Sequence, residues 1–162
     1  MIQSTTRHIL ILEDEDDFRD ILVRSRHELD IRKDDELHDF GNSRKTMGFL
    51  NGLDWAVDIA VLDLVLNEKP SLAYARIKKP TEFEGIDIYE KYKNRFRQTI
   101  FLTSAANYRM AMVAGFDFKR PNMQICLKTN PVEAREEDRF PNNLIQAIKN
   151  AYAELDKEDA GQ

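Results

Sequence analysis

The stretch HILILEDEDDF, residues 8–18, joins an apolar run directly to five consecutive acidic residues. Residues 9–12 are all Ile or Leu without alternation, which is typical of a parallel strand covered on both faces. Neighbouring like charges repel one another, so some of the acids would take up protons unless a cation compensated them. The sequence therefore predicts a buried strand whose carboxyl end needs a positively charged partner.

The composition fits one globular domain. The chain has 162 residues, of which 42% are hydrophobic and 33% are charged, and this is enough to bury a full core. Its net charge of −5 gives no electrostatic reason to expect direct binding of nucleic acid. The single cysteine, Cys126, excludes an internal disulfide. The polar N-terminus and the lack of any run near the roughly 20 apolar residues of a membrane span predict a cytoplasmic protein with no membrane partner.

Short apolar runs alternate with amphipathic segments along the chain. The predicted strands are Ile9–Leu12, Glu36–Phe40, Val57–Asp63, Thr99–Thr103 and Gln124–Lys128. Five helices are predicted. The first has an apolar face from Phe18 to Leu29, and the second begins at Asn42 or Ser43 and ends near Gly52. The third has an apolar face marked by Ile86, Tyr89 and Phe96, the fourth covers about Asn107–Ala114, and the fifth begins at Pro141. Five β–α units in succession predict an α/β fold, a doubly wound five-stranded parallel sheet with helices on both faces.

The carboxyl ends of the predicted strands should carry any site, because ligands of doubly wound sheets bind there. Four of the five strands end in or next to side chains with useful chemistry. These are Glu13 and Asp14 after the first strand, Asp63 at the end of the third, Thr103 and Ser104 at the fourth, and Lys128 at the fifth. The sequence therefore predicts that carboxylates, hydroxyls and an ammonium group meet at one edge of the sheet.

The three carboxylates of Glu13, Asp14 and Asp63 suit a divalent cation. Mg²⁺ prefers hard oxygen ligands and completes its shell with waters and phosphate oxygens. The absence of clustered His or Cys argues against zinc, and the three histidines show no ligand spacing. Asp63 is also suited to act as a nucleophile toward a phosphoryl group, with positive charge from Mg²⁺ and Lys128 and a hydrogen bond from the Thr103 hydroxyl.

Five motifs in the same order along the chain resemble the receiver domain of two-component response regulators. They are ILILEDEDDFRDIL, IAVLDLVL, IFLTSA, VAGFDF and ICLK. The resemblance covers about residues 7–155 and implies a flavodoxin-like sheet with strand order 2-1-3-4-5. It implies one receiver domain over residues 1–162, with a polar C-terminal tail at 157–162. Without an output domain in this sequence, a stand-alone receiver is expected.

The resemblance also implies roles for individual residues. Asp63 would accept a phosphoryl group from a histidine kinase or a histidine phosphotransfer protein. Mg²⁺ would be bound by Glu13, Asp14, Asp63 and the backbone carbonyl of Val65, with Thr103 as the switch hydroxyl and Lys128 as the phosphate-pairing lysine. The chain would then be no enzyme but a phosphoacceptor with intrinsic autophosphorylation and autodephosphorylation chemistry. A downstream protein partner would read its state, and a monomer or weak dimer is expected.

The sequence departs from the family pattern at three places. Thr129 follows the lysine where the family usually has proline, and Ile125 stands where it often has an aromatic residue. The stretch of about 67–84 is an insertion between Asp63 and Gly85, long enough to suggest either a functional loop beside the predicted phosphorylation site or a disordered one.

Two other functions were considered for these residues. A phosphohydrolase with an aspartyl nucleophile typically needs a second acid two residues later, but that position is Val65. A receiver-like protein-interaction module that signals without phosphorylation is the remaining alternative, and the departures at Ile125 and Thr129 favour it. Phosphate incorporation at Asp63 distinguishes it from a phosphoacceptor.

Overall fold

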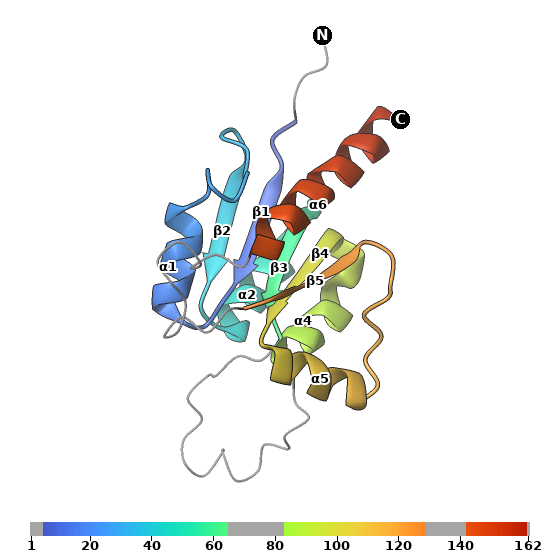
Figure 1. Ribbon diagram of the computed structural model, residues 1–162. Coiled ribbons are helices and arrows are strands. Elements are labelled where there is room, and N and C mark those ends of the chain that lie inside the picture. Colours follow the sequence, from blue (N-terminus) through green and yellow to red (C-terminus); the bar gives the residue numbers. More distant parts are fainter. Residues whose placement is uncertain (1–4, 65–82, 129–141, 162) are drawn as a thin grey trace.

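The computed structural model describes residues 5–64, 83–128 and 142–161. One five-stranded, all-parallel sheet with the order β2-β1-β3-β4-β5 forms its centre (Figure 1). The strands are β1 (His8–Leu12), β2 (Glu36–Phe40), β3 (Val57–Asp63), β4 (Phe96–Thr103) and β5 (Met123–Leu127). The predicted fold class and the flavodoxin-like strand order are confirmed.

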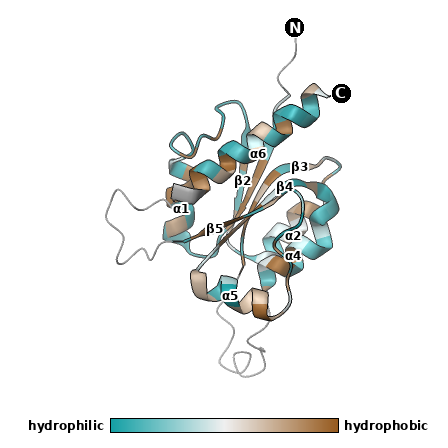
Figure 2. Ribbon diagram, turned by 45° about the vertical axis from the view of Figure 1, so that its right-hand side comes forward, coloured by the Kyte–Doolittle hydropathy of each residue, from teal (hydrophilic) through white to brown (hydrophobic). Residues whose placement is uncertain are grey.

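Helices cover both faces of the sheet. Helices α1 (Asp16–Arg24) and α6 (Asn142–Ala160) pack on one face, whereas α2 (Ser43–Asn51), α4 (Glu84–Tyr92) and α5 (Ala105–Val113) pack on the other, and the 3-10 turn η1 (Lys93–Arg95) leads into β4. Successive strand residues point to opposite faces, so Ile9 and Ile11 contact the first layer while Leu10 and Leu12 contact the second. Figure 2 shows apolar central strands between helices that carry both hydrophilic and hydrophobic residues.

The predicted strand boundaries agree with the structure to within one residue except at the start of β4, whereas several helix boundaries differ by more. Strand β4 begins at Phe96, which the sequence analysis had assigned to the preceding helix. Helix α1 ends at Arg24, although Leu29 beyond it is still fully buried. Asn42 caps α2 as predicted, because its side chain accepts a hydrogen bond of 2.8 Å from the Lys45 backbone N–H.

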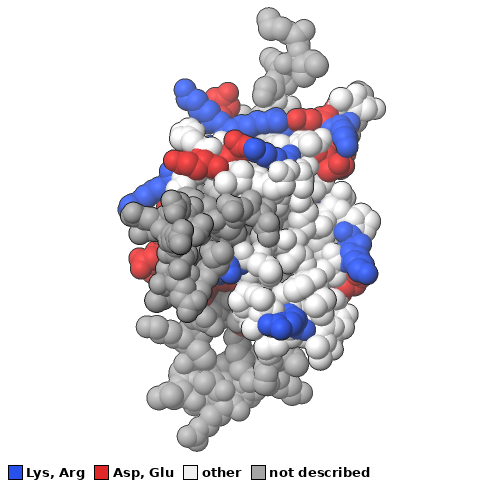
Figure 3. Space-filling model, viewed as in Figure 1, with Lys and Arg blue, Asp and Glu red and all other residues white. Residues whose placement is uncertain are grey.

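Helix α6 extends further than the sequence suggested. The polar tail predicted from residue 157 is the last part of this helix as far as Ala160. Arg97 lies 2.7 Å from Asp159 and 3.0 Å from Glu158, while Arg7 lies 2.9 Å from Asp159. Figure 3 shows the resulting mixture of positive and negative side chains along this end of the molecule. These ion pairs hold the helix end against the amino ends of β1 and β4.

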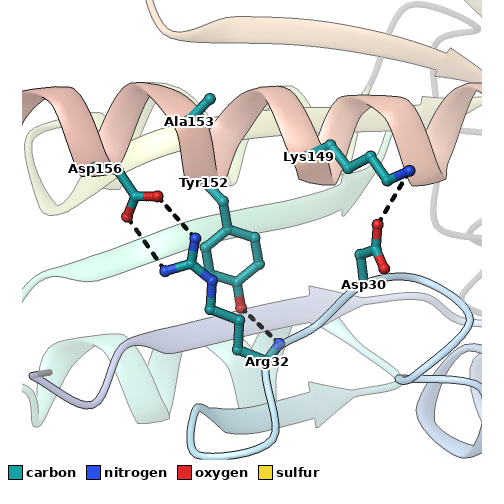
Figure 4. A pocket seen from close by; sticks show the side chains of 6 residues that line it. All are labelled: Asp30, Arg32, Lys149, Tyr152, Ala153 and Asp156. Carbon is teal, nitrogen blue, oxygen red and sulfur yellow. Dashed lines mark hydrogen bonds and ion pairs between the residues drawn. The ribbon is translucent and has the colours of Figure 1, made fainter.

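A pocket of about 390 Å³ lies between α6 and the segment that precedes β2 (Figure 4). Its lining residues are Asp30, Arg32, Lys149, Tyr152, Ala153 and Asp156. The Arg32 guanidinium lies 4.3 Å from the Tyr152 ring centroid and 2.8 Å from an Asp156 oxygen, and Lys149 lies 3.3 Å from Asp30. Because both basic groups pair with acids of the same pocket, we interpret it as a structural contact of α6. No helix among the described residues is long and apolar enough to cross a membrane.

Candidate functional site

The parallel register brings the predicted site residues to one edge of the sheet. Strand β3 pairs Asp63 with Leu102 of β4, and β4 pairs Thr103 with Leu127 of β5, directly before Lys128. Glu13 follows β1, whose last residue pairs with the residue before Asp63. Figure 1 shows these strand ends side by side. The predicted strand ends are therefore adjacent, and side chains at the ends of β1, β3 and β5 are observed in contact.

Three carboxylates gather at this edge. One oxygen each from Glu13, Asp14 and Asp63 lies within 4.8 Å of the other two. Glu13 is fully buried and Asp63 is 4% exposed, whereas Asp14 is partly exposed. These three side chains offer only hard oxygen ligands, a set that suits a divalent cation such as Mg²⁺ or Ca²⁺.

Lys128 lies between two of these carboxylates. Its Nζ is 2.7 Å from Glu13 Oε2 and 2.8 Å from Asp63 Oδ2, and its side chain is only 16% exposed. Its backbone N–H donates to the Thr103 carbonyl oxygen at 2.6 Å, which fixes the start of the side chain at the rim. The ammonium group therefore faces the carboxylates in a largely desolvated setting, where ion pairing is strong.

Burial makes the charged forms of these acids costly. It raises the pKa of Asp63 to about 8, with a further contribution from Glu13 and an opposing one from Lys128. Burial likewise raises the pKa of Glu13, again against Lys128. Burial alone would lower the pKa of Lys128, but Asp63 and Glu13 together raise it. One ammonium group thus leaves the carboxylates incompletely compensated, as expected of a place that receives another cation.

Gly85 allows α4 to approach the backbone of Asp63. A Cβ at this position would overlap the Asp63 carbonyl oxygen and lie 2.8 Å from its carbonyl carbon. The Gly85 backbone N–H also donates to the Leu64 carbonyl oxygen at 3.1 Å. In the sequence Gly85 marks only the end of the expected insertion, so this contact was not predicted. A glycine in the first turn of a helix beside the candidate site is the sequence signal for such a close approach.

The hydroxyls at the end of β4 have different environments. Thr103 is fully buried, and its Oγ1 donates to the Ser104 carbonyl oxygen at 3.3 Å. Ser104 caps α5, because its Oγ accepts a hydrogen bond of 3.2 Å from the Asn107 backbone N–H. Ser104 thus has a structural role that the sequence analysis did not assign.

Several predicted features lie outside the described residues. These are the carbonyl of Val65, the departure at Thr129, the helix start at Pro141 and residues 67–82 of the expected insertion. The last two residues of the expected insertion, Phe83 and Glu84, belong to the fold instead. Phe83 is buried in the core beside α2, α4 and α5, and Glu84 begins α4. Ile125 is half-buried on β5.

No protein-family model and no curated protein matches the sequence. Solved structures do match. The fold is that of a response regulator receiver domain. A two-component transcriptional regulator AraC from Clostridium phytofermentans aligns with a TM-score of 0.61 and 13% identity over 97% of this chain and 100% of its own. A response regulator receiver protein from Pseudoalteromonas atlantica aligns with a TM-score of 0.57 and 14% identity over 91% and 98%.

A third receiver-type structure was determined with ligands. It is a response regulator protein from Burkholderia pseudomallei with a phosphorylated aspartic acid, a calcium ion and citrate. It aligns with a TM-score of 0.50 and 15% identity over 95% of this chain and 73% of its own. At these identities the likeness concerns the fold, and the chemistry of this chain is argued from its own residues.

Proposed function

We propose that this chain is the phosphoacceptor domain of a two-component phosphorelay, in which Asp63 accepts a phosphoryl group from a histidine kinase or a histidine phosphotransfer protein. The observation that carries the proposal is the position of Lys128 Nζ, 2.8 Å from Asp63 Oδ2 and 2.7 Å from Glu13 Oε2, at the strand ends of a receiver fold. The proposal includes a single receiver domain over residues 1–162 and the cytoplasmic location expected from the sequence.

The transfer needs a nucleophile and nearby positive charge. An Asp63 oxygen forms a P–O bond while the P–N bond to the donor histidine breaks, and the electron pair of that bond stays on the histidine nitrogen. Lys128 already contacts the Asp63 carboxylate, so its ammonium group is close enough to pair with the negatively charged phosphoryl oxygens after transfer. The hydroxyl of Thr103, at the next strand end, is suited to donate a hydrogen bond to the same group.

Mg²⁺ is the cation that we propose for Glu13, Asp14, Asp63 and the backbone carbonyl of Val65. When bound, it would offset charge on both the carboxylates and the phosphoryl oxygens. The raised pKa values of Asp63 and Glu13 support a cation here, because a divalent ion removes the cost of ionising both groups. The Burkholderia protein, with its phosphorylated aspartic acid and calcium ion, supports the combination in this fold.

A downstream protein partner is supported by exposed apolar side chains on α5 and at the end of β5. Helix α5 exposes Met110, Met112 and Val113 by 45%, 44% and 90%, and Leu127 at the end of β5 is 38% exposed. Figure 3 shows few charged side chains over β5 and α5. Such a surface, which begins one residue before Lys128, suits a partner that responds to the state of Asp63.

Acetyl phosphate with Mg²⁺ and intact-mass measurement test the phosphoacceptor. The wild-type chain should gain one phosphoryl mass. So should the control Asp17→Asn, which changes an exposed acid of the acidic stretch at residues 13–17. Asp63→Asn should gain none. Equal labelling of Asp63→Asn would refute the assignment. No labelling of a well-folded wild-type chain would instead favour the interaction module that signals without phosphorylation.

A titration with Mg²⁺ tests the proposed metal-binding site separately. Asp14→Asn should weaken binding clearly more than Glu15→Gln, because the Asp14 carboxylate lies in the three-residue cluster and the exposed Glu15 does not. The two changes remove the same charge from adjacent positions, so long-range electrostatics affects them alike. Equal weakening in both variants would show that Mg²⁺ senses only the net charge of the acidic stretch.

A further inference from the structure

Two of the three histidines of this chain form part of a second cluster, far from Asp63. His8 begins β1, and His38 lies 30 residues later in the edge strand β2. The parallel register pairs His8 with Glu36 and Leu10 with His38, so His8, Glu36 and His38 share one face of the sheet. They lie at the amino ends of the strands, whereas Asp63 lies at a carboxyl end (Figure 1).

Three potential ligand atoms meet on this face. His8 Nδ1 lies 3.2 Å from His38 Nε2 and 3.4 Å from Glu36 Oε2, and the last two atoms are 3.6 Å apart. Ligand atoms around a tetrahedral zinc ion are about 3.3–3.6 Å apart, given Zn–N and Zn–O bonds of about 2.0–2.2 Å. A triangle with the observed sides has a centre about 2.0 Å from each corner. The cluster therefore has the dimensions of a zinc site before any ion binds.

We propose that His8, Glu36 and His38 bind a divalent cation of the zinc class, with the fourth position open to water or to a donor from another molecule. Two imidazoles and one carboxylate form a ligand set that zinc accepts, whereas Mg²⁺ prefers oxygen donors alone. This site and the carboxylate cluster at Asp63 thus select different ions by their donor atoms.

Contacts around the cluster hold the rings in place. The His8 imidazole stacks on the Trp55 indole with centroids 3.7 Å apart and an angle of 23° between the rings. The His38 ring lies 4.9 Å from that of Phe49. The side chains of His8 and His38 are 21% and 23% exposed, and that of Glu36 is 59% exposed. An ion can therefore enter from solvent while the sheet and the aromatic contacts keep both nitrogens positioned.

The competing explanation is a hydrogen-bonded pair of imidazoles with no metal affinity. His8 Nδ1 and His38 Nε2 are close enough to share one hydrogen bond in the absence of an ion. That pair does not need Glu36, whose carboxylate is mostly solvent-exposed, whereas a three-ligand site does. The contribution of Glu36 therefore separates the two explanations.

Calorimetric titration of Zn²⁺ into the full chain tests the site. The parent should be Asp63→Asn, so that the other cluster loses a carboxylate. We expect one Zn²⁺ per chain, bound at least about tenfold more weakly in Glu36→Gln and in His38→Ala, because even loss of a second-shell partner typically costs roughly 10–100-fold. The matched controls Glu28→Gln and His27→Ala change the same residue types at exposed positions and should bind as the parent does.

The single tryptophan provides a second measurement. Because Trp55 stacks on His8, Zn²⁺ should change its emission in the parent and the controls but not in His38→Ala. Glu36→Gln changes an exposed side chain, so the test survives even where His38→Ala does not fold. Absence of one-to-one binding, or equal affinity in Glu36→Gln and Glu28→Gln, would overturn the site.

Discussion

The two ends of the central sheet use acidic residues in opposite ways. At the carboxyl ends of the strands, Asp63 is 4% exposed, and burial raises its pKa to about 8. At the amino ends, the Asp156 side chain is 49% exposed, and hydrogen bonds from Arg32 and Arg7 lower its pKa to about 2. A carboxyl group whose pKa is lowered by folding stabilises the fold when it is ionised, whereas one whose pKa is raised by folding destabilises the fold when it is ionised. The paired Asp156 is therefore organised for stability, and the buried carboxylates at the carboxyl ends for a charged ligand.

Gly85→Ala should have the largest effect and should act on the carboxyl ends alone. The added Cβ meets the backbone of Asp63, which cannot move aside as a flexible side chain would. Overpacking of this kind costs about 1–3 kcal/mol, and occasionally more, in the free energy of unfolding. Denaturant unfolding measures this loss, and labelling with acetyl phosphate should fall with it because the phosphoacceptor is displaced.

Gly48→Ala is the matched control for this change. Gly48 lies inside α2, and a Cβ there has nothing within 4 Å. Replacement should stabilise the protein by about 0.5–1 kcal/mol, because alanine loses less backbone entropy in a helix. A Gly85→Ala protein as stable as Gly48→Ala would show that the approach of α4 to Asp63 is not close.

Asp63→Asn should stabilise the chain in the absence of divalent cations. The folded-state pKa of about 8 lies above the ordinary value of 3.8, so folding favours the protonated form. The wild type therefore loses stability as pH rises from about 4 to about 8, while the amide variant does not lose this contribution. We expect an advantage of the order of 1–2 kcal/mol for the variant at pH 8, measured by denaturant unfolding with a chelator present.

Mg²⁺ should reverse this order, since it binds the native wild type and adds to its stability by mass action. The variant lacks one carboxylate of the proposed metal-binding site and should gain less. A wild type that remains the less stable protein at saturating Mg²⁺ would contradict the presence of a metal-binding site at Asp63.

Much of the candidate site at the carboxyl ends of the strands could be predicted from the sequence. A run of Ile, Leu and Val identifies a buried parallel strand, and in a doubly wound sheet the residue after each strand lies at the common edge. The positions of Glu13, Asp63, Thr103 and Lys128 follow from these two rules, and all four were predicted. Strand order entered through the resemblance to receiver domains.

What the sequence could not show depends on contacts between distant segments. The cluster of His8, Glu36 and His38 depends on the register of β1 against β2, and 30 residues of sequence separate its histidines. The length of α6 was missed because its polar end has no apolar periodicity. That end is held by ion pairs with Arg7, the residue before β1, and with Arg97 of β4.

Asp156→Asn should have the smallest effect, and it tests the amino ends. Asp156 lies 2.8 Å from both Arg7 and Arg32, but its side chain is half exposed, and Arg7 keeps Asp159 at 2.9 Å. Solvent screens such pairs, so we expect a loss of less than about 1 kcal/mol, smaller at high salt. The sign of the pH dependence is opposite to that at Asp63. Because the folded-state pKa is lowered to about 2 from 3.8, the contribution is present above pH 3.8 and disappears as pH falls through 2.

Glu154→Gln is the matched control for Asp156→Asn. It lies on the same helix and loses the same charge, but its partner Lys157 is a neighbour in the helix and 74% exposed. The free energy of unfolding of wild type and both variants, measured at a series of acidic pH values, gives the difference. A larger loss in Glu154→Gln than in Asp156→Asn would contradict the view that the arginine pairs stabilise the amino ends. If the stability difference of Asp156→Asn instead fell in the same pH window as that of Asp63→Asn, the two ends would not differ in the way that their burial and partners require, because exposure with paired arginines and burial with a shared lysine shift a carboxyl pKa in opposite directions.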